Sequence, residues 1–187
     1  MRIIRQFEQE KLAELLDHLA VRSVALDAEL MKSVTEIVDD VRARGDRALI
    51  EYAARFDKVE LSELRIDADQ LRRFAGKVDE RVVRALREAI RNVRAFHKRQ
   101  LEESWIMNAA PGVELGQRIT PLERVGLYVP GGTAAYPSSV VMNVVPAQVA
   151  GVERIVVTTP PRTLSESPAM AAALLELDFV ETRGILD

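Results

Sequence analysis

The sequence contains no cysteine and only two histidines, His18 and His97, among its 187 residues. Disulfides and thiolate metal sites are therefore excluded, and neither histidine belongs to a local ligand motif such as H-E-x-x-H. We accordingly assign no metal role to either histidine. The absence of cysteine is compatible with a reducing cytosol, so we expect a cytoplasmic location.

Aromatic residues and excess charge are also scarce. Aromatic residues make up 5% of the chain, and the formal net charge is only −3. This balance gives no reason to expect nucleic acid or an anionic membrane as a partner. Charged residues nevertheless reach 29% and hydrophobic residues 48%, which is typical of a soluble globular protein.

Long hydrophobic runs are missing as well. The most apolar segment, residues 140–152, is interrupted by Asn143, Pro146 and Gln148. A membrane-spanning helix needs about 20 apolar residues, so a buried helix is the better interpretation. The N-terminal residues contain basic side chains but no continuous apolar stretch, and we expect ordinary structure there instead of a signal peptide.

Helical periodicity dominates the first hundred residues. One face of a predicted helix contains Leu30, Val34, Ile37, Val38 and Val41, and Gly45 can end this helix in a left-handed conformation. Asp46 can cap the helix that follows. The apolar face of that second helix is expected to contain Leu49, Tyr52, Ala53 and Phe56.

The clearest predicted helix runs from about residue 79 to residue 103. Its expected buried stripe consists of Val82, Leu86, Ala89, Ile90, Val93 and Phe96. The opposite side carries Arg84, Arg87, Arg91, Arg94 and Lys98. Acidic residues interrupt this basic side, and no aromatic residues interleave for base stacking. We therefore interpret it as a solvated face and not as a nucleic-acid-binding surface.

Strand patterns begin after the turn at residues 110–112. Residues 113–119 alternate like a strand beside water, and residues 124–129 and 154–159 are two further strand candidates. Between these last two lie a Gly-rich loop and a helix that Gly151 can end. This order predicts one right-handed βαβ unit with parallel strands, hence an α/β fold. A last helix is expected from Ser167 to Glu176, and one βαβ unit is too small to be a complete sheet.

The Gly-rich loop follows Tyr128 and has the sequence PGGTAAYPSS. It follows a strand and precedes a helix, the position at which backbone N–H groups bind phosphates in many proteins. Its sequence, however, matches neither G-x-G-x-x-G nor a P-loop. Two interpretations stay open, a ligand-facing turn and a tight connection whose glycines permit positive φ. Tyr128 either contacts a cofactor beyond its strand or packs under a helix. Ser138 and Ser139 are expected to be the N-cap pair of the next helix.

Four ordered segments resemble the N-terminal part of histidinol dehydrogenase, over about residues 30–176. The run VPGG-x-A-x-YPSS is a specific signature. Chance does not account for four matching segments in the same order. The segments are VRARGDRALIEYAARFD, NVRAFHKRQ, GQRITPLERVGLYVPGGTAAYPSSVVMN and VPAQVAGVERIVVTTPP.

The resemblance implies an aldehyde-dehydrogenase-like architecture with two Rossmann-like domains. Residues 1–112 would then be the helix-rich part of the first domain, and residues 113–187 an incomplete second domain. The family oxidises L-histidinol to L-histidine in histidine biosynthesis, with NAD and one zinc per site, as an intertwined homodimer. These properties would belong to the complete enzyme, including its zinc.

By the same resemblance, five residues correspond to the family's cofactor site. Tyr128 matches a tyrosine that contacts NAD, Pro130 a proline beside the cofactor, and Phe56 a phenylalanine near the nicotinamide end. Gly131 and Gly132 shape the same loop. The family's zinc ligands and its Glu–His pair correspond to positions beyond this sequence, so no catalytic or metal residue is assigned. We expect no dehydrogenase activity from the chain alone, and NAD affinity that is weak or absent.

Three functional hypotheses follow. In the first, the chain is a fragment of histidinol dehydrogenase, truncated before the catalytic residues and inactive by itself. In the second, it is half of a split enzyme that needs a second chain. In the third, it is a stand-alone interaction module that binds a partner through an open sheet edge or helix face.

Overall fold

The computed structural model describes residues 11–17, 28–131 and 136–177. Its internal contacts divide the chain into two compact units, Met1–Leu49 and Ile50–Asp187, and each is described by itself. The domain boundary expected near residue 112 refers to the family's complete domains and stays a prediction.

The first unit is helical. Helix α2 spans Ala28–Arg44, and helix α3, Asp46–Tyr52, begins directly after Gly45. Gly45 has φ +58°, and its N–H donates to the carbonyl of Val41 at 2.8 Å. This confirms the predicted left-handed helix stop. No residue of α2 is buried. Leu30, Val34 and Val38 of its predicted apolar face are exposed, and Ile37 and Val41 are half-buried.

The second unit opens with an irregular segment. A π-helix, η1, spans Ala53–Asp57, and Lys58 follows it in a left-handed conformation with φ +57°. Helix α4, Ala68–Ala75, was not predicted from the sequence. It begins with a capping box, in which Asp67 and Gln70 each accept the other's backbone N–H through their side chains.

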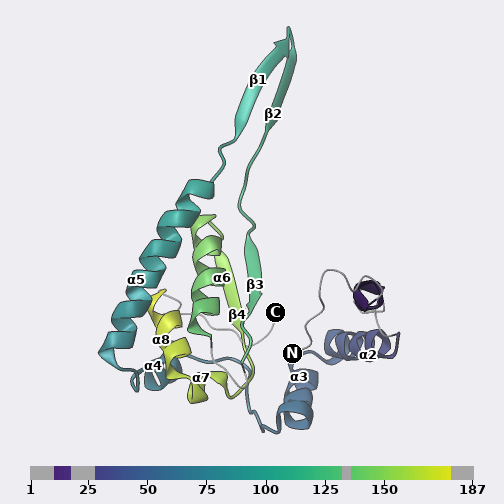
Figure 1. Cartoon of the computed structure of the whole chain (residues 1–187), viewed down its shortest axis with the longest axis vertical. Coiled ribbons are helices and arrows are strands. Elements are labelled where there is room, and N and C mark those ends of the chain that lie inside the picture. Colours follow the sequence, from purple (N-terminus) through teal and green to yellow (C-terminus); the bar gives the residue numbers. More distant parts are fainter. Residues whose placement is uncertain (1–10, 18–27, 132–135, 178–187) are drawn as a thin grey trace. The chain divides into compact units, whose positions relative to one another are not determined.

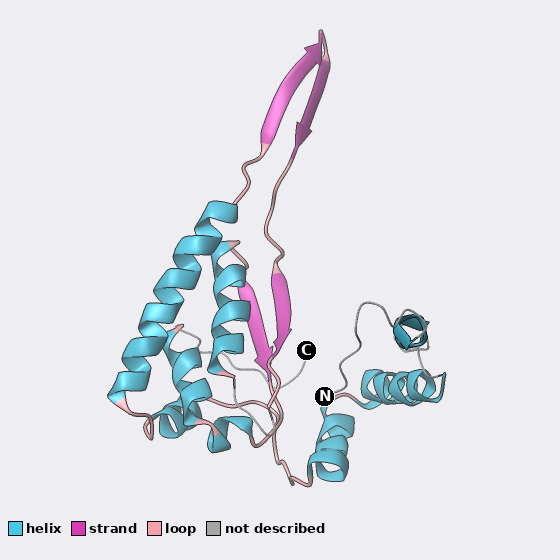
Figure 2. Ribbon diagram, viewed as in Figure 1, coloured by secondary structure: helices cyan, strands magenta, loops and turns pink. Residues whose placement is uncertain are grey.

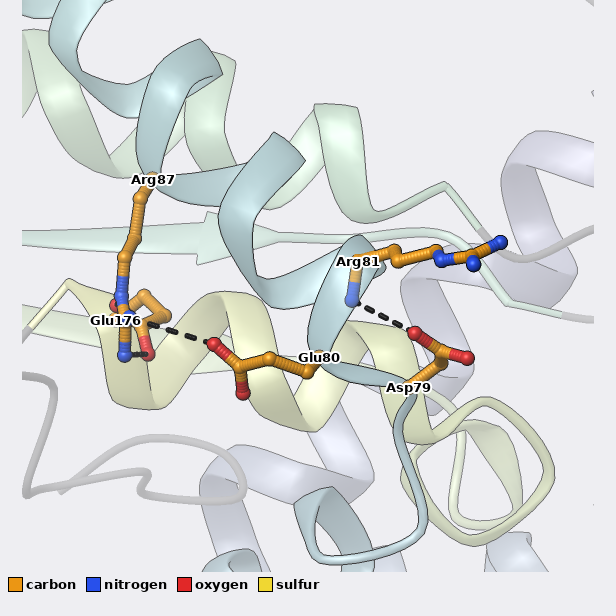
Figure 3. A network of polar contacts seen from close by, with 5 residues as sticks. All are labelled: Asp79, Glu80, Arg81, Arg87 and Glu176. Carbon is orange, nitrogen blue, oxygen red and sulfur yellow. Dashed lines mark hydrogen bonds and ion pairs between the residues drawn. The ribbon is translucent and has the colours of Figure 1, made fainter.

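Helix α5 spans Glu80–His97, and the side chain of its N-cap, Asp79, accepts a hydrogen bond from the backbone N–H of Arg81 at 2.7 Å (Figure 3). The expected end at residue 103 is wrong. A 3₁₀ turn, η2 (Lys98–Gln100), follows the helix, and the chain then becomes extended toward the next strand. The predicted buried stripe is only partly correct. Leu86 and Ile90 are buried and Val93 is half-buried, whereas Val82, Ala89 and Phe96 are exposed.

A β-hairpin follows α5. Strand β1, Trp105–Ala110, pairs antiparallel with β2, Val113–Gln117, around a turn in which Gly112 has φ +76°. Every residue of both strands is exposed, and the hairpin has no helix beside it (Figure 2). The predicted water-facing strand after residue 112 is confirmed, whereas β1 was not predicted.

The predicted βαβ unit is present. Strand β3, Arg124–Tyr128, runs parallel to β4, Arg154–Thr158, with Tyr128 opposite Thr158. Helix α6, Pro137–Val149, connects them, and Gly151 beyond its C-cap has φ +82°. Figure 2 shows both strands ending at the same edge. The α/β fold class is therefore correct.

The start of α6 differs from the prediction. Its N-cap is Tyr136, Pro137 is its first residue, and no side chain caps it. Ser138 and Ser139 lie inside the first turn and are not the N-cap pair. Proline at this position has no N–H to satisfy, and the N–H of Ser139 donates to the carbonyl of Tyr136 at 2.9 Å. The helix therefore begins without a serine cap.

Two helices follow β4. Helix α7, Thr163–Glu166, is a single short turn, and α8 spans Pro168–Glu176. This α8 is the predicted last helix, although the side chain of Ser167 at its N-cap makes no capping bond. In the part of the chain that the structure describes, every helix is too short or too polar to cross a membrane.

One hydrophobic core holds the βαβ unit and its helices together (Figure 1). It is built from α4, α5, α6, α7, α8 and the strands β3 and β4. Its larger fully buried side chains are Leu71, Val129, Val140, Val141, Val144, Val145, Leu164, Met170, Leu174 and Leu177.

An ion pair closes the outer edge of this core. The guanidinium of Arg87 on α5 donates to Glu176 on α8 through two hydrogen bonds of 2.6 and 2.9 Å (Figure 3). Glu176 raises the pKa of Arg87 by hydrogen bonding and by charge attraction, and Glu80 adds a smaller attraction. Arg87 therefore stays charged wherever the protein is folded.

Candidate cofactor-facing site

Tyr128 lies at the carboxyl end of β3 and is 63% exposed. Within the described residues, the tyrosine is therefore not packed under a helix. The next residue, Val129, is fully buried, and its N–H donates to the carbonyl of Thr158 at 2.8 Å. The pairing of the two strands thus continues to the point where the chain turns, and it leaves the Tyr128 ring outside the core.

Gly131 lies where the Gly-rich loop crosses the end of the next strand, after the exposed Pro130. A Cβ atom at Gly131 would stand 1.9 Å from Oγ1 of Thr163 and 3.0 Å from its Cβ. Gly131 is not among the glycines with positive φ. Its lack of a side chain therefore permits a close approach and not an unusual backbone angle. Gly132 lies outside the described residues.

The turn between β4 and α7 forms the other side of this contact. Thr159 follows β4 directly, and Thr163 begins α7 with 5% of its surface exposed. The hydroxyl oxygens of both threonines are buried without a hydrogen-bond partner. A buried polar group without a partner costs about 1–3 kcal/mol. Both oxygens are enclosed by the protein, with Thr163 Oγ1 directly against Gly131, so they lie inside the turn and are not open to a ligand in this structure.

Sequence reasoning missed this turn. The usable signal was polar residues directly after a parallel strand, since ligands bind outside the carboxyl ends of such strands. That rule was applied to Tyr128 after β3. It was not applied to the TTPPRT run at residues 158–163, after β4.

Phe56 lies in the π-helix η1 and is 56% exposed. Its ring stacks on Tyr52, with 5.6 Å between centroids and 7° between planes. The guanidinium of Arg55 stands 5.1 Å from the centroid of the same ring. The segment is also joined to the β4–α7 turn, because Nη2 of Arg162 donates to the carbonyl of Lys58 at 3.0 Å.

The structure thus gives the predicted residues different surroundings. Tyr128, Pro130 and Gly131 follow one strand, whereas Phe56 comes from η1 and is linked to them only through the β4–α7 turn. These residues offer aromatic surface and close backbone approach. Such an arrangement can hold a flat polar ligand, and it contains no evident nucleophile.

Histidine and acidic residues do not gather into a metal centre in the described ranges, where no group of three or more His, Cys, Asp or Glu side chains could hold an ion. Nδ1 of His97 lies 2.6 Å from Oε1 of Gln100, and its ring meets Phe96 edge-on at 5.4 Å. His97 therefore has a local structural role at the end of α5. His18 lies outside the described residues.

Comparison with known proteins assigns the family. The family model for histidinol dehydrogenase matches residues 21–184. The chain is 51% identical over 154 residues to histidinol dehydrogenase of Geobacillus kaustophilus, covering 82% of this chain and 36% of that protein. It is 46% identical over 159 residues to the Bacillus subtilis enzyme, covering 83% of this chain and 37% of that one.

A solved structure agrees with this. The histidinol dehydrogenase of Elizabethkingia anophelis superimposes with a TM-score of 0.77 at 30% identity, over 86% of this chain and 38% of that one. The chain thus spans little more than a third of the length of these relatives, at the level of both sequence and fold. On this evidence the chain belongs to the histidinol dehydrogenase family.

Proposed function

We propose that this chain forms one wall of the NAD site of a histidinol dehydrogenase, and that catalysis needs further polypeptide. The observation that carries the proposal is the pairing of an exposed Tyr128 with the close Gly131–Thr163 contact at the carboxyl ends of two parallel strands. That edge is the ligand-binding edge of open α/β sheets. Family membership supports NAD as the ligand.

The residues present fit a dinucleotide. The exposed ring of Tyr128 offers a stacking surface, and Pro130 lies beside it. The bare Gly131 lets a pyrophosphate approach the backbone, and we include Gly132 in the same loop.

Phe56 completes the proposed wall toward the nicotinamide end. Its exposed ring belongs to a segment hydrogen-bonded to the same β4–α7 turn. When bound, NAD accepts a hydride from the substrate. The chain's own contribution is to bind and orient the cofactor. The described residues provide no cluster that fits zinc, so no step through a metal is derived.

The assembled protein is proposed to oxidise L-histidinol to L-histidine in histidine biosynthesis. By family resemblance we also propose a homodimer and a cytoplasmic location, with neither nucleic acid nor membrane as partner. The zinc would be held by other parts of the complete enzyme. The domain boundary near residue 112 belongs to the same proposal.

A second version has the remaining polypeptide supplied by another chain, as in a split enzyme. The exposed hairpin fits this version, because Trp105, Met107 and Leu115 are each about half exposed, at 51%, 51% and 54%, but an interaction module would display such a surface as well. Apolar side chains displayed on an unsupported hairpin are typical of a surface that another polypeptide covers. The interaction-module hypothesis requires that no NAD binds.

The proposal is tested by adding NAD to the isotope-labelled chain and following its amide NMR signals. We expect weak, saturable binding with a Kd of roughly 1 mM, which corresponds to about 4 kcal/mol. The shifted signals should belong to residues 128–131 and 158–163. Tyr128→Ala should abolish the shifts, whereas Phe96→Ala, which removes a ring of similar exposure from α5, should preserve them. Absence of shifts in the wild-type chain at several times this concentration would refute the proposed NAD wall.

A further inference from the structure

The β4–α7 turn touches both parts of the proposed cofactor wall. Thr163 lies against Gly131 of the Gly-rich loop. The preceding residue, Arg162, reaches back 104 positions along the chain to the carbonyl of Lys58, one residue after η1. A single turn of the chain is therefore in contact with the loop that follows Tyr128 and with the segment that contains Phe56.

The backbone of Arg162 is held firmly at its own end of this link. Its carbonyl accepts hydrogen bonds from the hydroxyl of Ser165 and the N–H of Glu166, both at 2.9 Å. These bonds form the single turn of α7, which packs against the core through Leu164. The side chain thus extends from an anchored position, and its guanidinium carries a permanent charge and five donors.

The other end of the link is the backbone of Lys58, which has a strained conformation. Lys58 has φ +57°, a conformation that side chains other than glycine rarely adopt. Its Nζ donates to the carbonyl of Arg55 at 2.7 Å, and the N–H of Val59 donates to that of Ala53 at 3.4 Å. This shape turns the Lys58 carbonyl away from the helix and makes it available to Arg162.

The π-helix itself is informative. Single π turns inside helices are rare and occur frequently at functional sites. Phe56 in this π turn stacks on Tyr52, the residue directly before the turn, so the segment displays a pair of aromatic rings. The hydrogen bond from Arg162 to the Lys58 carbonyl therefore helps to position the Tyr52–Phe56 pair as well as the Lys58 peptide group.

We propose that Arg162 is a positioning residue, which ties the Phe56 segment to the carboxyl end of β4. It makes the Gly-rich loop and the Phe56 segment move as one wall around the bound ligand. The assignment of that ligand rests on the proposed NAD site, whereas the tether itself can be measured without NAD. The tether predicts that losing one exposed side chain loosens a segment far away in the sequence.

The first measurement is hydrogen exchange followed by mass spectrometry on the full chain. Arg162→Gln should speed exchange of the amides at residues 53–59 about tenfold, and exchange in β3 and β4 should stay unchanged. Arg162→Lys, which keeps a cationic donor, should restore part of the protection. The matched control is Arg87→Gln, which removes another interhelical arginine bond and should leave residues 53–59 unaffected.

The second measurement is the NAD titration by NMR in the same variants. Arg162→Gln should weaken NAD binding several-fold, whereas Arg87→Gln should leave it unchanged even if the unfolding midpoint falls. Faster exchange together with no NAD binding in the wild type would support the tether and refute the proposed function. Unchanged exchange, equal loosening by Arg87→Gln, or normal NAD binding in Arg162→Gln would each overturn the positioning role.

Discussion

Gly131 and Thr163 come from turns after two different strands, and their contact sets how closely those turns approach. The hypothetical Cβ at Gly131 would overlap Oγ1 of Thr163 and lie within 3.1 Å of its Cγ2. Thr163 is buried and cannot swing into solvent without disturbing α7. The close position of Thr163 thus requires a glycine at position 131. The loop sequence alone does not show this requirement.

Replacing Gly131 by alanine should therefore destabilise the protein. We expect a loss of about 1–3 kcal/mol in the free energy of unfolding, the usual cost of overpacking a filled site. Urea denaturation followed by circular dichroism measures this loss. Thr163→Ala in the same chain removes two of the three clashing atoms, so the double variant should recover part of the stability.

Gly126→Ala is the matched control, because nothing lies within 4 Å of the added Cβ on this exposed position of β3. It should change stability by no more than about 0.5 kcal/mol, as surface substitutions usually do. An equal effect of both substitutions, or additive effects of Gly131→Ala and Thr163→Ala, would show that the contact does not constrain the loop.

The residues themselves pointed to Tyr128 and the Gly-rich loop, whereas Pro130 was assigned by family resemblance, and all of these cofactor contacts stay predictions. Tyr128 and Pro130 stand beside a Gly-rich loop whose composition is visible in a short window. Arg162 and Thr163 acquire their roles only through contacts with Lys58 and Gly131, which are distant in sequence. Such roles depend on how the turns come together, and periodicity and composition carry no information about that.

Among the described elements, the β1–β2 hairpin has the least packing against the rest of the protein, since every residue of both strands is exposed. Its register places Met107 opposite Leu115, and Trp105 opposite Gln117, on one face. Because successive side chains alternate, the other face carries Asn108 opposite Glu114, together with the exposed Ile106 opposite Gly116. One face is therefore largely apolar and exposed to water, a situation that favours association.

We expect the chain to self-associate at high concentration through this apolar face. Leu115→Lys should reduce the association measured by light scattering or sedimentation. Asn108→Lys adds the same charge to the opposite face and should have much less effect. If both lysines reduce association equally, net charge and not the apolar face controls it.

Helices and strands were predicted correctly where several local sequence signals agreed. The βαβ unit combines apolar strands, a Gly-rich loop and Gly151 as a stop, and it was predicted in order. Helix α4 was missed because eight residues give little periodicity, although the box formed by Asp67 and Gln70 was a local signal. Strand β1 was missed because WIMNAA shows no alternation, and its partner β2 determines its conformation.

At the scale of the whole molecule, the chain holds a folded core and an open site. The helices around α6 bury a continuous apolar cluster, so unit Ile50–Asp187 has its own source of stability. The proposed cofactor wall lies at the edge of this core, with Tyr128 and Phe56 both more than half exposed. In a working dehydrogenase these surfaces would be shielded from water, as hydride-transfer sites require.

The last prediction concerns catalysis by the chain alone. With L-histidinol, NAD and added zinc, the purified chain should form no NADH above background. Its rate should be at least about 10²-fold below that of a relative, because positioned acid–base groups alone contribute 10²–10⁴-fold. The Bacillus subtilis enzyme, 46% identical over the shared region, is the positive control in the same absorbance assay. NAD-dependent histidinol oxidation by the purified 187-residue chain would contradict the prediction, and would mean that the exposed wall contains a base and a substrate site of its own.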